Sequence, residues 1–258
     1  MAHFVLVHGA YHGGWCWERL APLLEDHGHE VWAPDLPGMG QDARSGQVAT
    51  IEEWAEFIAA RARAGPRPIL VGHSRGGLVI SRTAELIPDQ LLGLVYLAAV
   101  LAPPGVTMMD AVGFLDMPPE IAQARQLSAD GRTSTWSSRV LARRVFYSET
   151  DALIVDRAFE RFSPEPAANI SWPLAASRER YGRVPRAFIE CLRDAAIPIA
   201  NQRRMVAAEP CKVWTLDADH SPFYSCPQEL ARVLDEIAHS WIAPPAEPMP
   251  PAGHERTQ

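Results

Sequence analysis

Short runs of apolar residues alternate with longer amphipathic segments along the first hundred residues of the chain. The runs predict four strands, at Phe4–Val7, Glu30–Ala33, Ile69–Val71 and Leu91–Leu97. The segments between them have apolar residues at helical spacing and predict helices at about Trp15–His27, Thr50–Ala64 and Ser74–Leu86. Thr50 and Glu53 have the spacing of a capping box. Apolar strands separated by helices are typical of a parallel sheet that is covered on both faces.

This alternation stops at Pro103 and Pro104, and from there to about Val184 no strong strand is predicted. We expect this segment to be helical, with helices at about Pro119–Leu127, Ser138–Tyr147 and Thr150–Arg161. The alternation then resumes, with strands at Arg186–Cys191 and Lys212–Leu216 and helices at Pro198–Ala208 and Pro227–Trp241. The pattern predicts a core formed by residues 1–102 and 185–243, with a helical cap inserted at 103–184. Residues 244–258 are rich in proline, and we expect them to be disordered.

The composition indicates a globular domain and argues against nucleic-acid-binding and membrane-spanning proteins. Of the 258 residues, 47% are hydrophobic and 21% charged, which is typical of a globular domain. The net charge of −7 opposes non-specific nucleic-acid binding, which depends on cationic side chains. No stretch reaches the ~20 apolar residues of a membrane span. The four cysteines lack the spacing of a zinc or redox motif and are expected to be reduced and buried. No secretory signal is recognised at the N-terminus, so a cytoplasmic location is expected.

The segment Gly72-His73-Ser74-Arg75-Gly76 matches the pattern G-x-S-x-G. It lies between a predicted strand and a predicted helix, which is the context of a nucleophile elbow. The glycines leave room for a tight turn, and the turn exposes the hydroxyl at the start of the helix. The pattern therefore predicts Ser74 as a nucleophile.

A serine nucleophile needs a base, and the base needs an acid that fixes its tautomer. His220 follows the last predicted strand and is the best candidate base, while His8 and His73 are expected to be structural. Asp194 follows the strand before it and has the expected chain order for the acid. Asp217 and Asp219 are rival acids. The histidines left over, apart from His12, are expected at the surface or the termini: His3, His27, His29, His239 and His254.

The oxyanion that forms during attack needs preformed hydrogen-bond donors. One is expected to be the backbone N–H of Arg75, the residue after the nucleophile. The other should come from the loop after the first strand, where Gly9 gives the backbone room and the N–H of Ala10 is the best candidate. His12 lies in the same loop and is a candidate to line the substrate pocket.

The opening stretch HFVLVHGAYHGGWCW closely resembles the plant methyl esterase and hydroxynitrile lyase group of the α/β-hydrolase superfamily. The resemblance continues through APDLPGMG, GHSRGG, the stretch from CLRDAAIP to QRRM, and ADHSPFYSCPQEL, whereas residues 103–184 match only in character. It implies an α/β-hydrolase fold of eight strands trimmed at its N-terminal edge, with a helical cap over the site. It also implies a triad of Ser74, Asp194 and His220, and no cofactor.

Two positions separate the activities of this group. The members that cleave cyanohydrins carry Thr at the position of Gly9 and Lys at that of Ser221. A departing cyanide anion needs a positive partner, so both differences favour the esterase branch. Arg75 stands where the group often has Leu or Met. Its side chain either contacts a polar or acidic group of the substrate or forms an ion pair at the junction with the cap.

The leading hypothesis is a serine carboxylic-ester hydrolase whose substrate is a small or aromatic, polyketide-like (methyl) ester. Its partner is then a small molecule, not nucleic acid or membrane, and a homodimer is left open. The alternatives are a cofactor-free lyase or natural-product tailoring enzyme on the same triad, and a slow hydrolase-fold ligand-binding protein. Several residues are candidates for the substrate pocket, and those of the insertion could equally form the core of the cap: Ser221, Phe114, Met117, Trp136, Phe146 and Phe159.

Overall fold

A six-stranded parallel sheet forms the centre of the molecule in the computed structural model, which describes residues 1–113 and 119–242. The strands lie in the order β2-β1-β3-β4-β8-β9, and every neighbouring pair is parallel. Their bounds are β1 His3–Val7, β2 Glu30–Trp32, β3 Ile69–His73, β4 Gly93–Leu97, β8 Arg186–Cys191 and β9 Lys212–Leu216. The six strands predicted for the core are confirmed. Their number fits an eight-stranded fold that lacks the two strands at its N-terminal edge.

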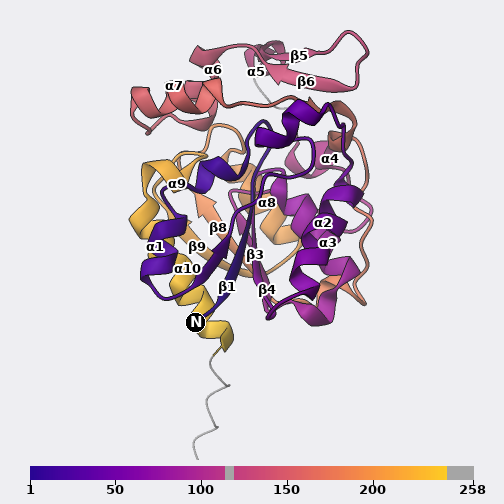
Figure 1. Ribbon diagram of the computed structural model, residues 1–258, viewed down its shortest axis with the longest axis vertical. Helices are drawn as coiled ribbons and strands as arrows, with labels where there is room; N and C mark the ends of the chain where they lie inside the picture. The colour runs from indigo at the N-terminus through magenta and orange to yellow at the C-terminus, as the bar shows by residue number, and fades with distance from the viewer. Residues whose placement is uncertain (114–118, 243–258) are drawn as a thin grey trace, which may run out of the picture.

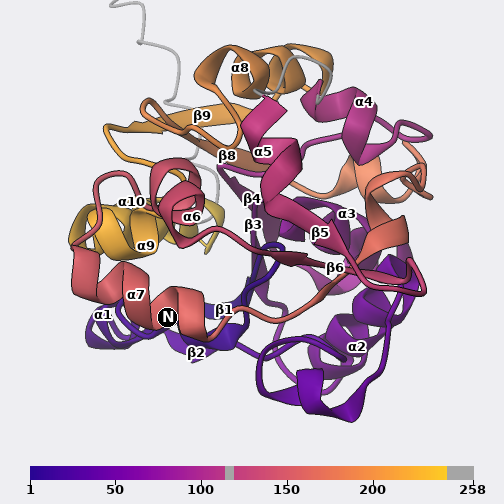
Figure 2. The ribbon, with the colours of Figure 1, turned by 90° about the horizontal axis from the view of Figure 1, so that it is seen from above.

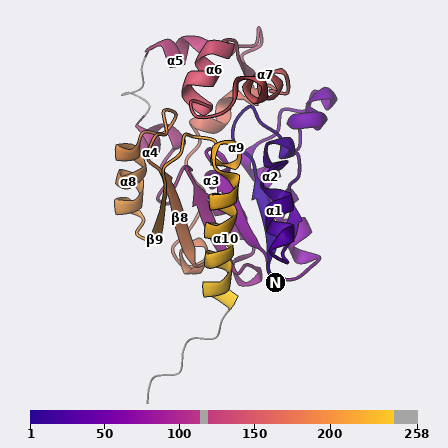
Figure 3. The same cartoon turned by 90° about the vertical axis from the view of Figure 1, so that its left-hand side faces the viewer.

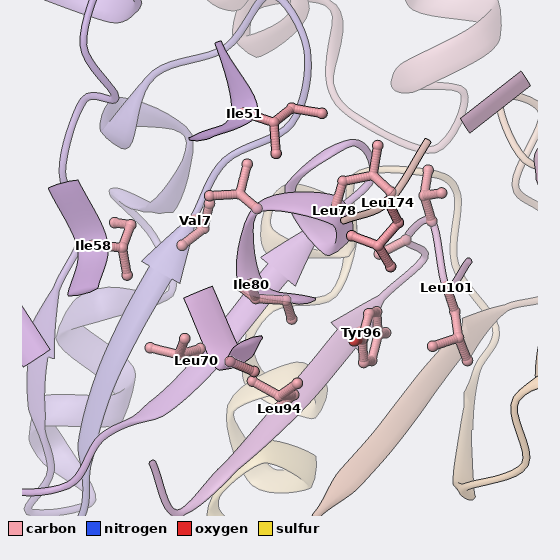
Figure 4. Close-up of a cluster of buried hydrophobic side chains, with 14 of the residues drawn as sticks. Val7, Ile51, Ile58, Leu70, Leu78, Ile80, Leu94, Tyr96, Leu101 and Leu174 are labelled. Carbon is pink, nitrogen blue, oxygen red and sulfur yellow. The ribbon is translucent and has the colours of Figure 1, made fainter. Parts of the chain in front are cut away.

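Helices cover both faces of this sheet (Figures 1 and 3). Alternate residues of β1 pack on opposite faces: Val5 and Val7 belong to one apolar cluster, and Phe4 and Leu6 to the other. The first cluster also contains side chains of α2 (Ile51–Arg63), α3 (Gly76–Leu86), α4 (Met108–Val112) and α8 (Ile199–Ala208). The second contains side chains of α1 (Ala21–Asp26), α9 (Pro222–Ser225) and α10 (Pro227–Ile242). In Figure 4, Leu70 and Leu94 of neighbouring strands face Ile80 of α3 within the first cluster.

The helix boundaries follow local sequence signals. Thr50 caps α2, because its hydroxyl accepts a hydrogen bond from Glu53 N, and the Glu53 carboxylate accepts one from Thr50 N, which confirms the capping box. The helix predicted at Trp15–His27 is instead divided. A 3-10 turn spans Gly14–Trp17, and α1 begins only at Ala21, because Pro22 is tolerated in the first turn of a helix and not in its interior. Other 3-10 turns are η2 Gly40–Ser45, η3 Pro88–Gln90, η5 Ala167–Ile170 and η6 Tyr181–Arg183.

Part of the inserted segment forms a separate layer over one end of the sheet, which we call the upper layer and define as residues 119–166 (Figures 1 and 2). Its elements are α5 Pro119–Ala124, β5 Arg125–Leu127, β6 Thr133–Trp136, α6 Arg139–Phe146, α7 Ala152–Glu160 and β7 Glu165–Pro166. The three strands form an antiparallel sheet, β5-β6-β7. The expectation of helix without strand was therefore wrong here. These strands have two to four residues each and lack an apolar face, so they give no periodic signal.

The other described parts of the insertion, residues 103–113 and 167–184, pack against the body of the molecule. Met108 and Val112 of α4, with Leu174 and Tyr181 after the upper layer, belong to the first apolar cluster of the sheet. All four cysteines are free, as expected. Cys16 and Cys191 are buried, while Cys211 and Cys226 are only half-buried, so the expectation of burial is right for the first two and wrong for the others. Residues 244–258 lie outside the part that the structure describes.

Candidate active site

The three predicted triad residues follow three different strands of the parallel sheet, each beyond the carboxyl end. Ser74 follows β3, Asp194 lies three residues after β8, and His220 lies four residues after β9. In a parallel sheet these ends meet at one edge, where α/β folds gather their functional groups. The upper layer lies over this same edge, since its residues contact the loop after β1.

Ser74 occupies a strained turn between β3 and α3. Its φ angle is +53°, a left-handed conformation that is costly for a residue with a side chain. The turn is closely packed: a Cβ atom on Gly72 would lie 2.7 Å from Gly76 O, and one on Gly77 would lie 2.2 Å from Val100 O. Between Ile69 and Ser81, Ser74 is the residue that is not fully buried. The elbow therefore presents the hydroxyl at the edge of the sheet.

His220 and Asp194 form a buried hydrogen-bonded pair. His220 Nδ1 lies 2.8 Å from Asp194 Oδ2, and both side chains are almost fully excluded from solvent. The Asp194 carboxylate also accepts hydrogen bonds from Ala196 N at 2.7 Å and Ile197 N at 2.8 Å, both to Oδ1. Because these amides can only donate, the carboxyl acts as an acceptor, so we assign the His220 proton to Nδ1. This tautomer leaves Nε2 unprotonated, as a general base requires.

Gln202 of α8 is a further partner of this carboxylate, and the sequence analysis gave it no role. Its amide Nε2 donates to Asp194 Oδ2 at 3.1 Å and to Ile197 O at 2.7 Å, and its Oε1 accepts from Cys191 N at 3.1 Å. Gln202 is fully buried. It therefore links the end of β8 to the loop that carries Asp194. Gln202 begins the QRRM segment of the family resemblance, which pointed to this position without giving the residue a role.

The rival acids have other partners. Asp219 is buried, but its Oδ1 accepts from Ser221 N and Ser225 Oγ, and its Oδ2 accepts from Glu149 N. Asp217 is exposed and pairs with Arg193 at 2.9 Å. Of the three aspartates, it is Asp194 that hydrogen-bonds the His220 ring.

His73, beside Ser74, connects the elbow to the histidine loop. Its Nε2 donates to the backbone oxygen of His220 at 2.8 Å, and the two rings have centroids 4.6 Å apart. Burial lowers the pKa of His73 well below its usual value, and the neighbouring imidazole of His220 lowers it further. A neutral His73 is therefore a structural link between the loops that carry Ser74 and His220, as expected.

The loop after β1 places Ala10, one predicted oxyanion donor, beside the elbow, which itself contains Arg75, the other predicted donor. A Cβ atom on Gly9 would lie 2.9 Å from Ser74 Cβ, so the backbone of this loop touches the nucleophile. The backbone N–H groups of Ala10 and Arg75 donate to no acceptor in the part of the chain that the structure describes. Two free donors beside a serine are suited to bind a negative oxygen.

His12 joins this loop to the upper layer. Its Nδ1 donates to Ala10 O at 2.6 Å, so its Nε2 accepts from the hydroxyl of Tyr147 at 2.5 Å. Burial lowers the pKa of His12 to about 4, which keeps the ring neutral near pH 7. Sequence reasoning proposed His12 as a pocket residue. The structure gives it both of its hydrogen bonds within the protein, and Tyr147 is a partner that the sequence did not indicate.

Arg75 points its side chain into the junction with the upper layer. Its Nε lies 3.0 Å from Oε1 of Glu165 on β7, and both side chains are buried. Its Nη2 donates to Gly9 O at 3.0 Å, and its guanidinium lies 4.1 Å from the centroid of the Trp54 ring. Of the two expected roles, the structure therefore shows the ion pair. Glu165 could not be found beforehand, since it lies 90 residues away on a two-residue strand.

Aromatic side chains of the upper layer and of the loop after β1 pack together beside His220. The Phe146 ring lies 5.8 Å from that of His220 and 4.8 Å from that of Trp136. Phe159 contacts Phe162, which in turn stacks on Tyr11 at 6.1 Å. Ser221 is fully buried, and its hydroxyl has no hydrogen-bond partner among residues 1–113 and 119–242. The two other pocket candidates, Phe114 and Met117, lie outside the described residues.

One histidine contradicts the expectation of surface exposure. His29 is buried; its Nδ1 accepts from Ala2 N, and its Nε2 contacts Asp235 at 2.9 Å. His29 therefore links the residue before β1 to α10, and a single polar residue in a loop gives no sign of such a contact.

Among residues 1–113 and 119–242, no group of three or more His, Cys, Asp or Glu could hold a metal ion. Within those ranges no helix combines the length and apolar character that crossing a membrane requires.

The chain is similar to known proteins over nearly its whole length. The profile described as "Alpha/beta hydrolase family" matches residues 4–233. Methylesterase 7 of Arabidopsis thaliana is 31% identical over 253 residues, covering 92% of the chain and 96% of that protein. A pyrethroid hydrolase of Sphingobium wenxiniae is 34% identical over 271 residues, covering 96% and 94%. The crystal structure of polyneuridine aldehyde esterase superposes with a TM-score of 0.85 at 26% identity, covering 92% and 99%.

Proposed function

The chain belongs to the alpha/beta hydrolase family, and from that premise we propose that it is a serine carboxylic-ester hydrolase. One observation carries the proposal. A serine in a strained elbow shares one edge of the sheet with a buried, hydrogen-bonded histidine–aspartate pair. That arrangement has the parts of a Ser-His-Asp triad, with Ser74 as nucleophile, His220 as base and Asp194 as the orienting acid.

The first half of the reaction forms an acyl-enzyme. Ser74 Oγ attacks the ester carbonyl carbon while His220 Nε2 takes the hydroxyl proton. The negative oxygen of the tetrahedral intermediate accepts hydrogen bonds from the N–H groups of Ala10 and Arg75, which form the oxyanion hole. Asp194 holds the imidazolium in the required orientation. The intermediate collapses by breaking the bond to the alcohol oxygen, which receives the proton from His220.

The second half releases the acid. Water attacks the acyl carbon of the ester formed on Ser74, and His220 takes a proton from this water. The same two N–H groups bind the second oxyanion. Breakdown returns the proton from His220 to Ser74 Oγ and frees the carboxylic acid, so no cofactor takes part in any step.

The substrate class is a small or aromatic ester whose apolar part contacts the upper layer, which would act as the cap. Phe146 supports this, because it supplies apolar surface next to His220, and Trp136 packs against Phe146. The names of three relatives also support an ester substrate: they are a methylesterase, a pyrethroid hydrolase and polyneuridine aldehyde esterase. A methyl ester of an aromatic or polyketide-like acid is therefore the class to screen.

Ester hydrolysis is favoured over cyanohydrin cleavage by the two positions beside the triad. A side chain at Gly9 would collide with Ser74, since a Cβ atom there would lie 2.9 Å from Ser74 Cβ. Ser221 offers a hydroxyl where a cation would be needed for departing cyanide. A binding protein with a slow triad remains the competing hypothesis, and sustained turnover separates the two.

The test is release of p-nitrophenol from p-nitrophenyl acetate and butyrate by the wild type and by Ser74→Ala. We expect continuous turnover by the wild type and none above background by the folded variant. A single burst from the wild type, or equal rates from both proteins, would contradict the proposal. Active wild type would then be screened against methyl esters of aromatic acids.

A further inference from the structure

The loop after β1 is held in place by hydrogen bonds to the carbonyl oxygens of two successive residues, Gly9 and Ala10. Gly9 O accepts from Arg75 Nη2 at 3.0 Å and contacts His8 Nδ1 at 2.9 Å. Leu36 N donates to His8 Nε2, so in a neutral His8 the proton lies on Nδ1, which therefore donates to Gly9 O. Ala10 O accepts from His12. The donors to Gly9 O thus come from β3's elbow and from the loop itself.

The bond to Gly9 O fixes the direction of the Ala10 N–H. The carbonyl of Gly9 and the N–H of Ala10 belong to one planar peptide unit, and no peptide bond in the described residues is cis. The two groups therefore point in opposite directions. Holding the oxygen on the side of the Arg75 guanidinium directs the N–H away from that guanidinium, and this N–H has no acceptor in the described part of the protein.

A cationic donor also changes the strength of this amide. A guanidinium makes a charge-assisted hydrogen bond, stronger than a bond from a neutral group. Withdrawing electron density from the Gly9 oxygen polarises the whole peptide unit and makes its N–H a better donor. The effect is large where water is excluded, and the Arg75 side chain is fully buried.

The upper layer holds the guanidinium in this position. Glu165 contacts Arg75 through both carboxylate oxygens, at 3.0 Å to Nε and 3.4 Å to Nη2. The same carboxylate accepts from Tyr11 N at 3.4 Å, and Ser163 N donates to Tyr11 O at 2.8 Å. Glu165 therefore fixes Arg75 and the loop together, so the loop geometry depends on how the upper layer is seated.

We propose that the Arg75 side chain is a positioning residue of the oxyanion hole, acting through the Gly9–Ala10 peptide and held by Glu165. This inference rests on the proposed function. Arg75 would then serve the oxyanion twice: directly through its own backbone N–H, and indirectly through the peptide that its side chain holds.

The test is Arg75→Met, which removes the guanidinium and keeps the backbone N–H. We expect kcat/KM for p-nitrophenyl butyrate to fall about 10- to 100-fold, mostly in kcat, less than the loss of a whole oxyanion donor. The Ki of 1,1,1-trifluoro-2-octanone, which forms a tetrahedral adduct with a serine, should rise by a similar factor. The Ki of 2-octanone, which binds without forming an oxyanion, should stay the same.

Two further variants separate this role from a structural one. Arg186→Met removes an arginine that is 12% exposed and pairs with Glu209 at 2.9 Å at the start of β8, and this variant should leave kcat/KM unchanged. If Arg75→Met does not fold, the double variant Arg75→Met/Glu165→Gln leaves no unpaired buried charge and keeps an acceptor for Tyr11 N. The double variant should show the same selective loss of trifluoroketone binding.

The outcomes distinguish the two proposals. Wild-type kcat/KM and wild-type trifluoroketone affinity in the arginine variant would overturn the positioning role while leaving the esterase proposal intact. Equal weakening of both ketones would also overturn it, because it would indicate general damage to the pocket. Hydrolysis by the wild type that survives Ser74→Ala would overturn the esterase proposal, and the positioning role with it.

Discussion

At the scale of single residues, the two oxygens of the Asp194 carboxylate have different partners. Oδ1 is bound by two backbone amides of its own loop, and Oδ2 is left for His220 and Gln202. The carboxylate is thus fixed before it contacts the imidazole. The proposed catalytic role of Asp194 depends on this orientation as much as on its charge.

We predict that Asp194→Asn keeps its fold and loses about 10⁴-fold in kcat, because an amide favours the wrong tautomer of His220. Steady-state kinetics with p-nitrophenyl butyrate, together with circular dichroism, measures both effects. Asp217→Asn is the matched control, since Asp217 is exposed and pairs with Arg193. Near-normal turnover by Asp194→Asn would transfer the acid role to another carboxylate.

Gly9→Ala is predicted to lower kcat/KM about 100-fold, because the new Cβ atom would lie 2.9 Å from Ser74 Cβ and move the oxyanion loop. Gly65→Ala is its control, since a Cβ atom there would meet only the end of the Arg61 side chain, at 3.6 Å. Equal activity of the two variants would mean that the loop does not carry an oxyanion donor.

A motif or the chain order is enough to predict a role for some residues of the candidate site. Ser74 lies in G-x-S-x-G between a strand and a helix, and Asp194 and His220 follow the expected strands. Their partners could not be predicted in the same way. Glu165 contacts Arg75 from 90 residues away, and such a contact leaves no local pattern. Gln202 lies only eight residues after Asp194, but its contact depends on how α8 packs beside β8, which no motif reports.

At the scale of elements, apolar periodicity predicted the parallel strands well and the upper layer poorly. The buried strands consist of apolar runs, whereas β6 reads Thr-Ser-Thr-Trp and β5 continues directly from α5. These short strands are stabilised by pairing with one another rather than by an apolar face. Their existence therefore depends on the tertiary structure, which periodicity does not report.

The capping box of α2 gives a prediction at this scale. Thr50→Ala removes the acceptor of Glu53 N and should lower the free energy of unfolding by about 1 kcal/mol. The box lies outside the candidate site, so kcat/KM should not change. Urea unfolding and p-nitrophenyl butyrate hydrolysis measure the two quantities. An unchanged urea midpoint would show that the cap contributes nothing to the fold.

At the scale of the whole molecule, neutral buried histidines make stability depend on pH. Burial lowers the pKa of His8, His12 and His73, that of His12 to about 4. Between about pH 6.5 and pH 4 the unfolded chain binds a proton at such a position and the folded chain does not. The stabilisation is therefore complete above pH 6.5 and is lost as the pH falls, by about 3 kcal/mol for His12.

His12→Gln should flatten this part of the stability curve. We predict that its free energy of unfolding falls less steeply from pH 6.5 to pH 4.5 than that of the wild type. His239→Gln is the control, because the His239 side chain is 69% exposed, and it should retain the wild-type slope. Chemical denaturation at several pH values measures the slopes. A slope of His12→Gln equal to that of the wild type would contradict a neutral, buried His12.

The central claim is that Ser74 carries the acyl group during turnover, and trapping that intermediate tests it most directly. Wild-type protein is mixed with p-nitrophenyl acetate, quenched in acid within the first turnovers, digested and examined by mass spectrometry. The account predicts an acetyl group on the peptide that contains Ser74, its decay as substrate is exhausted, and its absence from Ser74→Ala. Rapid turnover by the wild type with no acetyl group on that peptide, or with the acetyl group on another residue, would contradict it.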